Sequence, residues 1–259
     1  MDLRELPAAP FVRHPWEIAR ARFFVGLVRE VLPDGQRLRV LDVGAGDGYL
    51  ATELVRALAA GSTVVCLDPH YSDDQIAALG AASGGAIHFT RDVTAARFDL
   101  LLLLDVIEHV PDDGEFLSRL VREHLDPCGY ALVSVPAWQR LFTEHDVQLG
   151  HHRRYRPRQL DDVLGRAGLR RVDGGSLFSS LLLPRTAEKL VELARGVHST
   201  PNGAPPDHAA TNVASFRGGK LLGAAVTWVL DRDADAGRAL SRRGVILPGL
   251  SVWALGRRQ

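Results

Sequence analysis

The stretch that decides the fold runs from Leu38 to Gly48 and reads Leu-Arg-Val-Leu-Asp-Val-Gly-Ala-Gly-Asp-Gly. Its apolar first half predicts a buried strand, and the glycines predict a tight turn into a helix from about Tyr49 to Ala60. A second apolar strand follows from Thr63 to Leu67 and ends before Asp68. This order of strand, helix and strand indicates a βαβ unit, which implies a parallel sheet with a right-handed crossover.

The rest of the chain keeps alternating between strand patterns and helical patterns. We expect further strands at residues 86–90, 98–104, 130–135, 169–177 and 250–255, and helices at residues 16–32, 113–124 and 158–167. Consecutive leucines from Leu100 to Leu104 indicate a strand buried on both faces. The sequence therefore predicts an α/β fold with a doubly wound, mostly parallel, seven-stranded sheet whose last strand is antiparallel.

Residues 182–243 interrupt this alternation with a helical pattern before the last strand. We interpret them as a helical cap inserted between strands six and seven, with a mobile loop near residues 198–212, where Ser, Pro, Asn and Gly gather. Residues 1–36 form an N-terminal helical flank, and residues 37–181 with 244–259 form the core. Ligands of doubly wound sheets bind outside the carboxyl ends of the strands, so we expect the cap and the flank to roof the site.

Composition narrows the class of function. The chain has 259 residues, of which 46% are hydrophobic and 24% charged, and its formal net charge is +0. The lack of a basic field argues against nucleic acid and anionic membranes as partners and favours a small molecule. Two cysteines cannot form a disulfide framework, the first residues lack a signal-peptide profile, and no run approaches ~18 apolar residues. We therefore expect a cytoplasmic monomer or homodimer without stable membrane insertion.

The glycine loop, residues 42–48, points to a nucleoside ligand. Its glycines expose main-chain N–H groups to a ligand at the start of the next helix. Dinucleotide-binding loops read G-x-G-x-x-G, which would place the third glycine where Tyr49 stands, and Asp42 would repel a pyrophosphate. Asp42 suits instead a ligand with a positive ammonium group. Asp68, 20 residues after Gly48, ends the next strand, where a carboxylate accepts hydrogen bonds from both hydroxyls of a ribose.

These motifs resemble those of the class I S-adenosylmethionine-dependent methyltransferases. The resemblance rests on residues 40–48, on residues 98–100 with 105–110, and on the turn at residues 126–129, and it covers residues 40–177, over half of the chain. It implies a Rossmann-like fold, S-adenosylmethionine as the cofactor and a methyltransferase activity. Cys128 stands where the turn of the family has glycine, which affects a structural position only.

The resemblance also implies which residues hold the cofactor. Asp42 and the glycines would hold its methionine portion, and Asp68 its ribose. Asp92 and Val93 would lie beside the adenine, and Asp105 would face the cofactor from the end of strand four. The full set of expected cofactor-binding residues is Asp42, Gly44, Ala45, Gly46, Gly48, Asp68, Pro69, Asp92, Val93 and Asp105.

Methyl transfer to a hydroxyl needs a base that removes the proton, and histidine suits this role near neutral pH. His109 follows strand four, and three more histidines, at positions 145, 151 and 152, lie in the polar loop after strand five. Both places open onto the ligand end of the sheet. We expect His145 and His152 as the preferred catalytic residues. His109 is either catalytic or packed beneath the cofactor, and His151 points outward.

A metal site is a second interpretation of the same histidines. The pattern Asp105-x-x-Glu108-His109 resembles a ligand set of some methyltransferases that use a divalent cation, and His145 or His152 would complete it. The same short motif is common where no metal binds. We therefore predict no metal.

Arginines are concentrated between His151 and Arg158. Such clusters can follow RNA phosphates, but the zero net charge and the lack of a second basic patch argue against that function. We expect Arg153 to form bidentate hydrogen bonds to a carboxylate or phosphate of the substrate. We expect the other arginines to be solvated or paired with Asp161 and Asp162. Tyr155 either lines the substrate pocket or anchors the loop.

The combined motifs predict a methyltransferase that acts on a small molecule, with oxygen as the acceptor atom and a histidine as the base. Two alternatives stay open. An NAD(P)-dependent oxidoreductase is disfavoured by the position of the third glycine and by Asp42. A non-catalytic module that binds the cofactor would share every motif of the fold.

Overall fold

The computed structural model describes residues 12–32, 35–94, 96–196, 216 and 218–259. Their strands form a seven-stranded sheet in the order β3-β2-β1-β4-β5-β7-β6, with helices between the strands. The predicted α/β fold with its antiparallel last strand is confirmed. By its internal contacts the chain divides into two compact units, residues 1–103 with 123–130 and 212–232, and residues 104–122 with 131–211 and 233–259.

The first unit contains the parallel part of the sheet. Its elements are α1 (Pro15–Val31), β1 (Arg39–Val43), α2 (Tyr49–Ala57), β2 (Thr63–Leu67), α3 (Asp73–Ala82), β3 (Ile87–Thr90), most of β4 (Phe98–Leu104) and the first part of α8 (Gly219–Ser241). β1 pairs in parallel with β2 and with β4, and Val43 is the register partner of both Leu67 and Leu103. These three strands therefore end at one edge of the sheet.

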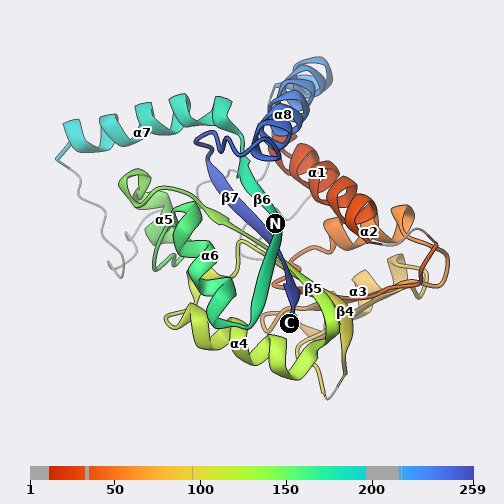
Figure 1. Cartoon of the computed structure of the whole chain (residues 1–259). Coiled ribbons are helices and arrows are strands. Elements are labelled where there is room, and N and C mark those ends of the chain that lie inside the picture. The colour runs from red at the N-terminus through yellow and green to blue at the C-terminus, as the bar shows by residue number, and fades with distance from the viewer. Residues whose placement is uncertain (1–11, 33–34, 95, 197–215, 217) are drawn as a thin grey trace. The chain divides into compact units, whose positions relative to one another are not determined.

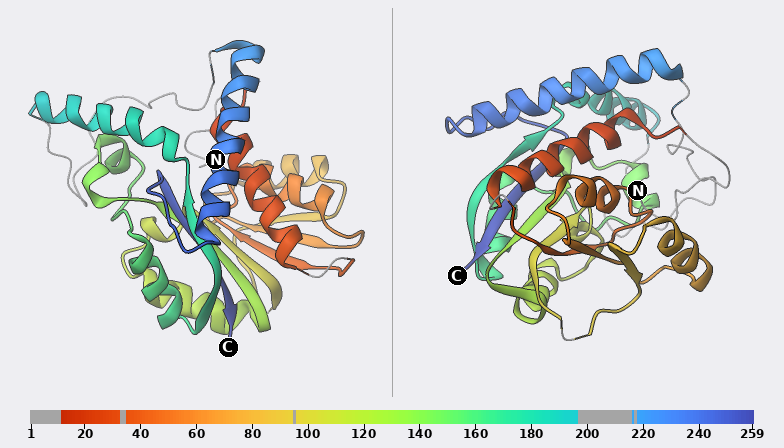
Figure 2. Two further views of the ribbon diagram at one scale, coloured as in Figure 1. Left: turned by 45° about the horizontal axis from the view of Figure 1, so that its top comes forward. Right: turned by 90° about the vertical axis from the view of Figure 1, so that its right-hand side faces the viewer.

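The core of this unit follows from its apolar runs. Leu100 to Leu103 are fully buried, as the prediction of burial on both faces requires. α1 begins at Pro15, and the side chain of His14 caps it by accepting a hydrogen bond from the backbone N–H of Trp16. α1 and the first half of α8 run side by side (Figure 2). Arg22 of α1 forms an ion pair with Asp231 of α8 at 2.9 Å.

The second unit contains the antiparallel end of the sheet. Its elements are η2 (Ile107–His109), most of α4 (Asp113–His124), the second half of β5 (Leu125–Pro136), η3 (Gln139–Leu141), α5 (Glu144–Gln148), α6 (Pro157–Arg166), β6 (Leu169–Leu177), η4 (Ser179–Leu181), α7 (Leu182–Ala194), the last part of α8 and β7 (Ser251–Arg258). β7 runs antiparallel to β6 along its whole length (Figure 1). The register of the pair is irregular between Arg171 and Asp173. α6 packs against both strands.

The start of the fifth strand differs from the prediction. The fifth strand was expected to begin at Tyr130 after a turn, but β5 begins at Leu125 and includes that turn. Cys128 takes a left-handed conformation with φ 68°, and a Cβ on Gly129 would lie 3.1 Å from the carbonyl oxygen of Asp99. The strand therefore continues through the turn residues because Gly129 allows a close approach to its neighbour.

The region expected to form the cap contains two described helices, α7 and α8. The loop expected at residues 198–212 lies outside the described residues. Several large apolar side chains of these helices are exposed, among them Leu183, Leu190, Leu221 and Trp228. Within the described part of the chain, no helix has the length and apolar character needed to cross a membrane. The roofing role of these helices stays a prediction.

Candidate active site

The glycine loop connects β1 to α2 in the first unit. Gly44, Gly46 and Gly48 have φ angles of 66°, 56° and 68°, in the left-handed region that favours glycine. The N–H of Gly44 donates to the carbonyl of Leu67 at the end of β2, 2.8 Å away. A Cβ on Gly48 would lie 2.7 Å from the ring of Phe89. The loop therefore needs its glycines for conformation and, at position 48, for space.

The end of β2 holds this loop in place. Oδ2 of Asp68 accepts a hydrogen bond from the N–H of Gly46 at 3.3 Å, and Oδ1 accepts one from the N–H of His70 at 3.0 Å. The hydroxyl of the buried Tyr71 donates to the carbonyl of Gly46 at 2.6 Å. The strand pattern predicted the position of Asp68, whereas Tyr71 is revealed only by this contact across 25 residues.

Asp42 is a buried carboxyl at the end of β1. Burial raises its pKa to about 7, the negative charges of Asp47 and Asp68 add to the rise, and the guanidinium of Arg20 opposes it. A cation bound beside Asp42 would stabilise its charged form. Arg20 belongs to α1, so a residue outside the motifs also shapes the electrostatics of the loop.

The start of α1 also reaches the glycine loop. Arg13 forms an ion pair with Asp47, and its guanidinium lies 3.9 Å from the ring centroid of Tyr49. A second ion pair joins Arg13 to the buried Glu17, at 3.6 Å. The sequence predicts that this flank lies near the site, but no short motif identifies Arg13 or Glu17.

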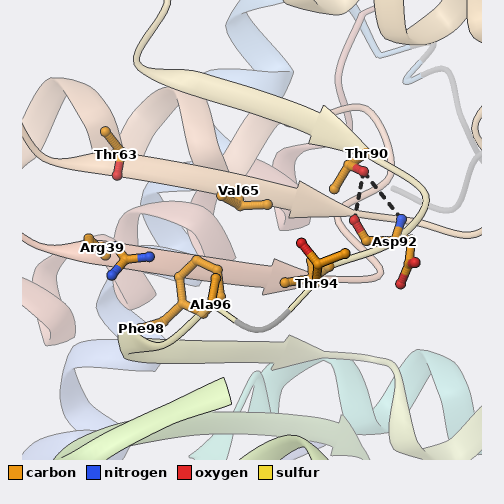
Figure 3. A pocket seen from close by; sticks show the side chains of 9 residues that line it. Arg39, Thr63, Val65, Thr90, Asp92, Thr94, Ala96 and Phe98 are labelled. Carbon is orange, nitrogen blue, oxygen red and sulfur yellow. Dashed lines mark hydrogen bonds between the residues drawn. The ribbon is translucent and has the colours of Figure 1, made fainter. Parts of the chain in front are cut away.

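Asp92 and Val93 lie in the connection from β3 to β4. The hydroxyl of Thr90 donates to the carbonyl of Asp92 at 2.8 Å. Beside this connection lies a cavity of about 250 Å³ on the face of β1 and β2, with Asp92 at one end and Arg39 and Thr63 at the other (Figure 3). Arg39 and Thr63 begin their strands, so the cavity extends away from the edge that carries the glycine loop. A contact of Asp92 and Val93 with adenine stays a prediction.

In the second unit, polar residues follow β4 and β5. Asp105, directly after β4, has φ 60°, an uncommon conformation for a residue other than glycine, and its N–H donates to the carbonyl of Ser134 at 2.8 Å. Glu108 is fully buried in η2. Its carbonyl accepts a hydrogen bond from the N–H of His152 at 2.8 Å, which fastens the loop after β5 to the turn after β4.

His151 lies inside the protein, so the expectation that it points outward is wrong. It is 9% exposed, and its Nδ1 is 2.8 Å from Oδ1 of Asp146. Asp146 also accepts hydrogen bonds from Arg154 and Arg185, each at 2.8 Å. Burial alone would raise the pKa of Asp146, but the hydrogen bond from His151 and the two guanidinium groups outweigh it and hold the pKa well below its ordinary value.

The ring of His151 packs edge-on against that of His109, with centroids 4.6 Å apart. One nitrogen or oxygen each of Glu108, His109 and His151 lie within 4.8 Å of one another, a spacing that also permits a cation. The partners expected from the sequence, Asp105, His145 and His152, do not belong to this group of three.

The other expected histidines have different surroundings. His145 is half-buried in α5, and burial, followed by the charge of Arg185, lowers its pKa, so that its ring is neutral near pH 7. His152 is half-buried and adjoins the buried His151. The catalytic role of either side chain stays a prediction.

The expected substrate residues converge on Asp113 at the start of α4. Nη1 of Arg153 lies 3.0 Å from Oδ2 of Asp113, and the hydroxyl of Tyr155 donates to the same oxygen at 2.8 Å. Tyr155 is buried, and burial raises its pKa. Arg154 was expected to be solvated or to pair with Asp161 or Asp162, and this expectation is wrong. Arg154 is buried and pairs with Asp146, whereas Asp161 pairs with Arg171.

The family model described as "Methyltransferase domain" matches residues 16–173, which include the glycine loop and His151. The chain belongs to the class I S-adenosylmethionine-dependent methyltransferases. This methyltransferase is 29% identical over 206 residues to the ubiquinone biosynthesis O-methyltransferase of Mesorhizobium japonicum. The aligned residues cover 71% of this chain and 75% of that protein. This chain is 38% identical over 104 residues to the enzyme of the same name from Azorhizobium caulinodans, but there it spans only 40% of the relative.

Solved structures share the fold of this methyltransferase. An S-adenosylmethionine-dependent methyltransferase from Mesorhizobium loti has a TM-score of 0.52 and 15% identity, and covers 90% of this chain and 96% of its own. The [4+2]-cyclase SpnF has a TM-score of 0.54 and 18% identity, and covers 99% of this chain and 90% of its own. At these identities the likeness concerns the fold alone.

Proposed function

We propose that this methyltransferase transfers the methyl group of S-adenosylmethionine to a hydroxyl oxygen of a small molecule. The observation that carries the proposal is the glycine loop, with its left-handed glycines fastened to Asp68 and its buried Asp42. The names of the curated relatives, both O-methyltransferases, support oxygen as the acceptor atom. Composition supports a small acceptor, because the formal net charge is +0.

The residues of the first unit fit this cofactor. Asp42 would face the ammonium group of the methionine portion, because a positive charge offsets the cost of ionising a buried carboxyl. Gly44, Ala45, Gly46 and Gly48 would bring the main chain close to the cofactor. The further proposed contacts are with Asp68, Pro69, Asp92, Val93 and Asp105. When bound, the cofactor supplies an electrophilic methyl carbon on a positively charged sulfur.

The second unit supplies the groups for the acceptor. A hydroxyl becomes a good nucleophile when a base removes its proton, and His109, His145, His151 and His152 all lie in the segments after β4 and β5. Arg153 and Tyr155 support the same region through Asp113. We propose that they shape the loop, so that their effect on the acceptor passes through the position of the histidines.

A different reaction on the same fold is the second candidate. The structural likeness to a [4+2]-cyclase supports it, because the same architecture carries a different named activity there. In that case the cofactor would bind without donating its methyl group. Oxidoreductase activity has less support, since the loop lacks a glycine at the position of Tyr49.

Two measurements test the proposed function. Calorimetry with S-adenosylhomocysteine and with NADH should give binding of the first only, and binding of NADH alone would contradict the proposal. Mass spectrometry with a trideuteromethyl donor and a panel of phenols, aliphatic alcohols and amines should then give labelled O-methyl products. Labelled amines alone would move the acceptor atom to nitrogen, and cofactor binding without any labelled product would favour the second candidate.

A further inference from the structure

Asp146 and His151 form a buried polar contact in the segment between β5 and α6. Both side chains are buried. Asp146 sits in α5, and besides His151, Arg154 and Arg185 it accepts the backbone N–H of Thr143 at 2.8 Å. A carboxylate held by this many donors stays charged and cannot rotate away from the imidazole.

This contact determines which nitrogen of His151 carries a proton. An ionised carboxylate only accepts hydrogen bonds, so Nδ1 of His151 must donate to Asp146. In the neutral ring, Nε2 then carries the lone pair. Asp146 therefore sets the tautomer that a proton acceptor needs, and its negative charge stabilises the imidazolium that forms when Nε2 takes a proton.

The edge-on neighbour of the ring is His109, which belongs to η2, the short helix that follows β4. Charged and titratable groups that surround the pair come from four segments: Glu108 and His109 in η2, His145 in α5, Arg154 in the loop and Arg185 in α7.

We infer that His151 is the general base of the methyl transfer and that Asp146 is its positioning residue. The inference rests on the proposed O-methylation. The O–H bond of the acceptor breaks and its proton passes to Nε2 of His151 while the oxygen forms a bond to the methyl carbon. The bond between that carbon and sulfur breaks with its electron pair on sulfur. The sulfonium thus loses its positive charge while the imidazole beside Asp146 becomes a positively charged imidazolium. The proton later passes from Nε2 to solvent.

The pair also has a purely structural explanation, because Asp146 links His151 and Arg154 of the loop to Arg185 of α7. The experiment must therefore separate catalysis from folding. The variants are His151→Gln and His151→Ala, with His88→Gln as the matched control on an exposed histidine of β3. Asp146→Asn is compared with Asp162→Asn, which changes an exposed aspartate of α6.

Three readouts are expected to agree. His151→Gln should lower kcat by about 10²- to 10⁴-fold, with the affinity for S-adenosylhomocysteine and the melting temperature close to those of the wild type. Added imidazole should restore part of the activity of His151→Ala. Long-range ¹H–¹⁵N NMR, without any acceptor, should show a proton on Nδ1 of His151, and Asp146→Asn should weaken this preference while lowering kcat by at least about tenfold.

Several results would overturn the inference. These are a kcat of His151→Gln within threefold of the wild type, a proton on Nε2 in the NMR spectrum, or a loss of activity confined to His145→Gln or His152→Gln. Loss of activity with a chelator and recovery with Mg²⁺ would instead indicate that Glu108, His109 and His151 bind a cation. If Asp146→Asn does not fold, the kcat of the His151 variants and the tautomer of His151 in the wild type still test the inference. A wild type that fails to bind S-adenosylhomocysteine contradicts the proposed function itself, whereas a wild type that methylates equally well without His151 contradicts only this inference.

Discussion

The backbone N–H of Gly46 donates a hydrogen bond to Oδ2 of Asp68, 3.3 Å away and 22 residues later in the chain. The contact forms because β1 and β2 are parallel and in register, so the residues after Val43 and Leu67 leave the sheet side by side. Asp68 thus stabilises the conformation of the glycine loop and, as proposed, also binds the ribose. Its two roles use different lone pairs of the same carboxylate.

Asp68→Ala should weaken the binding of S-adenosylhomocysteine by about 10- to 100-fold. Hydrogen bonds to a charged group contribute about 1.5–3 kcal/mol, and the loop loses its acceptor for the N–H of Gly46 as well. Isothermal titration calorimetry measures the change. Asp74→Ala, on the exposed side of α3, is the matched control. An unchanged affinity in Asp68→Ala would show that the cofactor does not reach the end of β2.

Gly48→Ala should destabilise the fold by about 1–3 kcal/mol. A side chain at φ 68° costs about 1–2 kcal/mol, and the new Cβ would lie 2.7 Å from the ring of Phe89. Thermal unfolding measures the loss, and Phe89→Leu in the same chain should recover the steric part only.

Gly80→Ala in α3 is the control for Gly48→Ala, because nothing lies within 4 Å of its Cβ and the backbone is helical there. It should be neutral or stabilise by up to about 1 kcal/mol. Equal effects of both glycine variants would contradict the strained turn.

Asp42 should make the stability of the ligand-free protein depend on pH between about 4 and 7. Its pKa is higher in the folded protein, about 7, than in the unfolded chain, so ionisation opposes folding. The contribution of Asp42 to the free energy of unfolding is therefore highest at low pH and falls as pH rises through this range, by on the order of 4 kcal/mol.

Asp42→Asn removes this titration. The melting temperature of the variant minus that of the wild type should grow from pH 5 to pH 8, as followed by circular dichroism. S-adenosylhomocysteine should stabilise the wild type more at pH 8 than at pH 5, because its ammonium group favours the ionised carboxyl. A difference that stays flat with pH would show that Asp42 is ionised throughout.

Local patterns in the sequence were sufficient for most of the sheet. The buried leucines of β4 and the tight turn of the glycine loop follow from neighbours in the chain, and both predictions are confirmed. α3 was missed although Ser72 and Gln75 form its capping box. None of its residues is buried, so it lacks the apolar stripe by which a helix is recognised.

The candidate site was harder to predict because long-range contacts orient its side chains. Asp146 is five residues from His151 but 39 residues from Arg185, and no periodic pattern links them. The same holds for Tyr71, whose hydroxyl binds Gly46. A sequence can therefore indicate which segments carry histidines, whereas the choice among them depends on which carboxylate lies beside each ring.

Tyr155→Phe tests whether Tyr155 anchors the loop or contacts the acceptor. Its buried hydroxyl donates a hydrogen bond to the carboxylate of Asp113. Removing the hydroxyl should lower the free energy of unfolding by about 1–3 kcal/mol, because this hydrogen bond involves a charged group. The KM for the acceptor should stay within about twofold if the hydroxyl only anchors the loop. Steady-state kinetics and thermal unfolding on the same preparation separate these effects. An unchanged stability with a KM raised tenfold or more would instead assign the hydroxyl to the acceptor, and the contact with Asp113 would then have to break during the reaction.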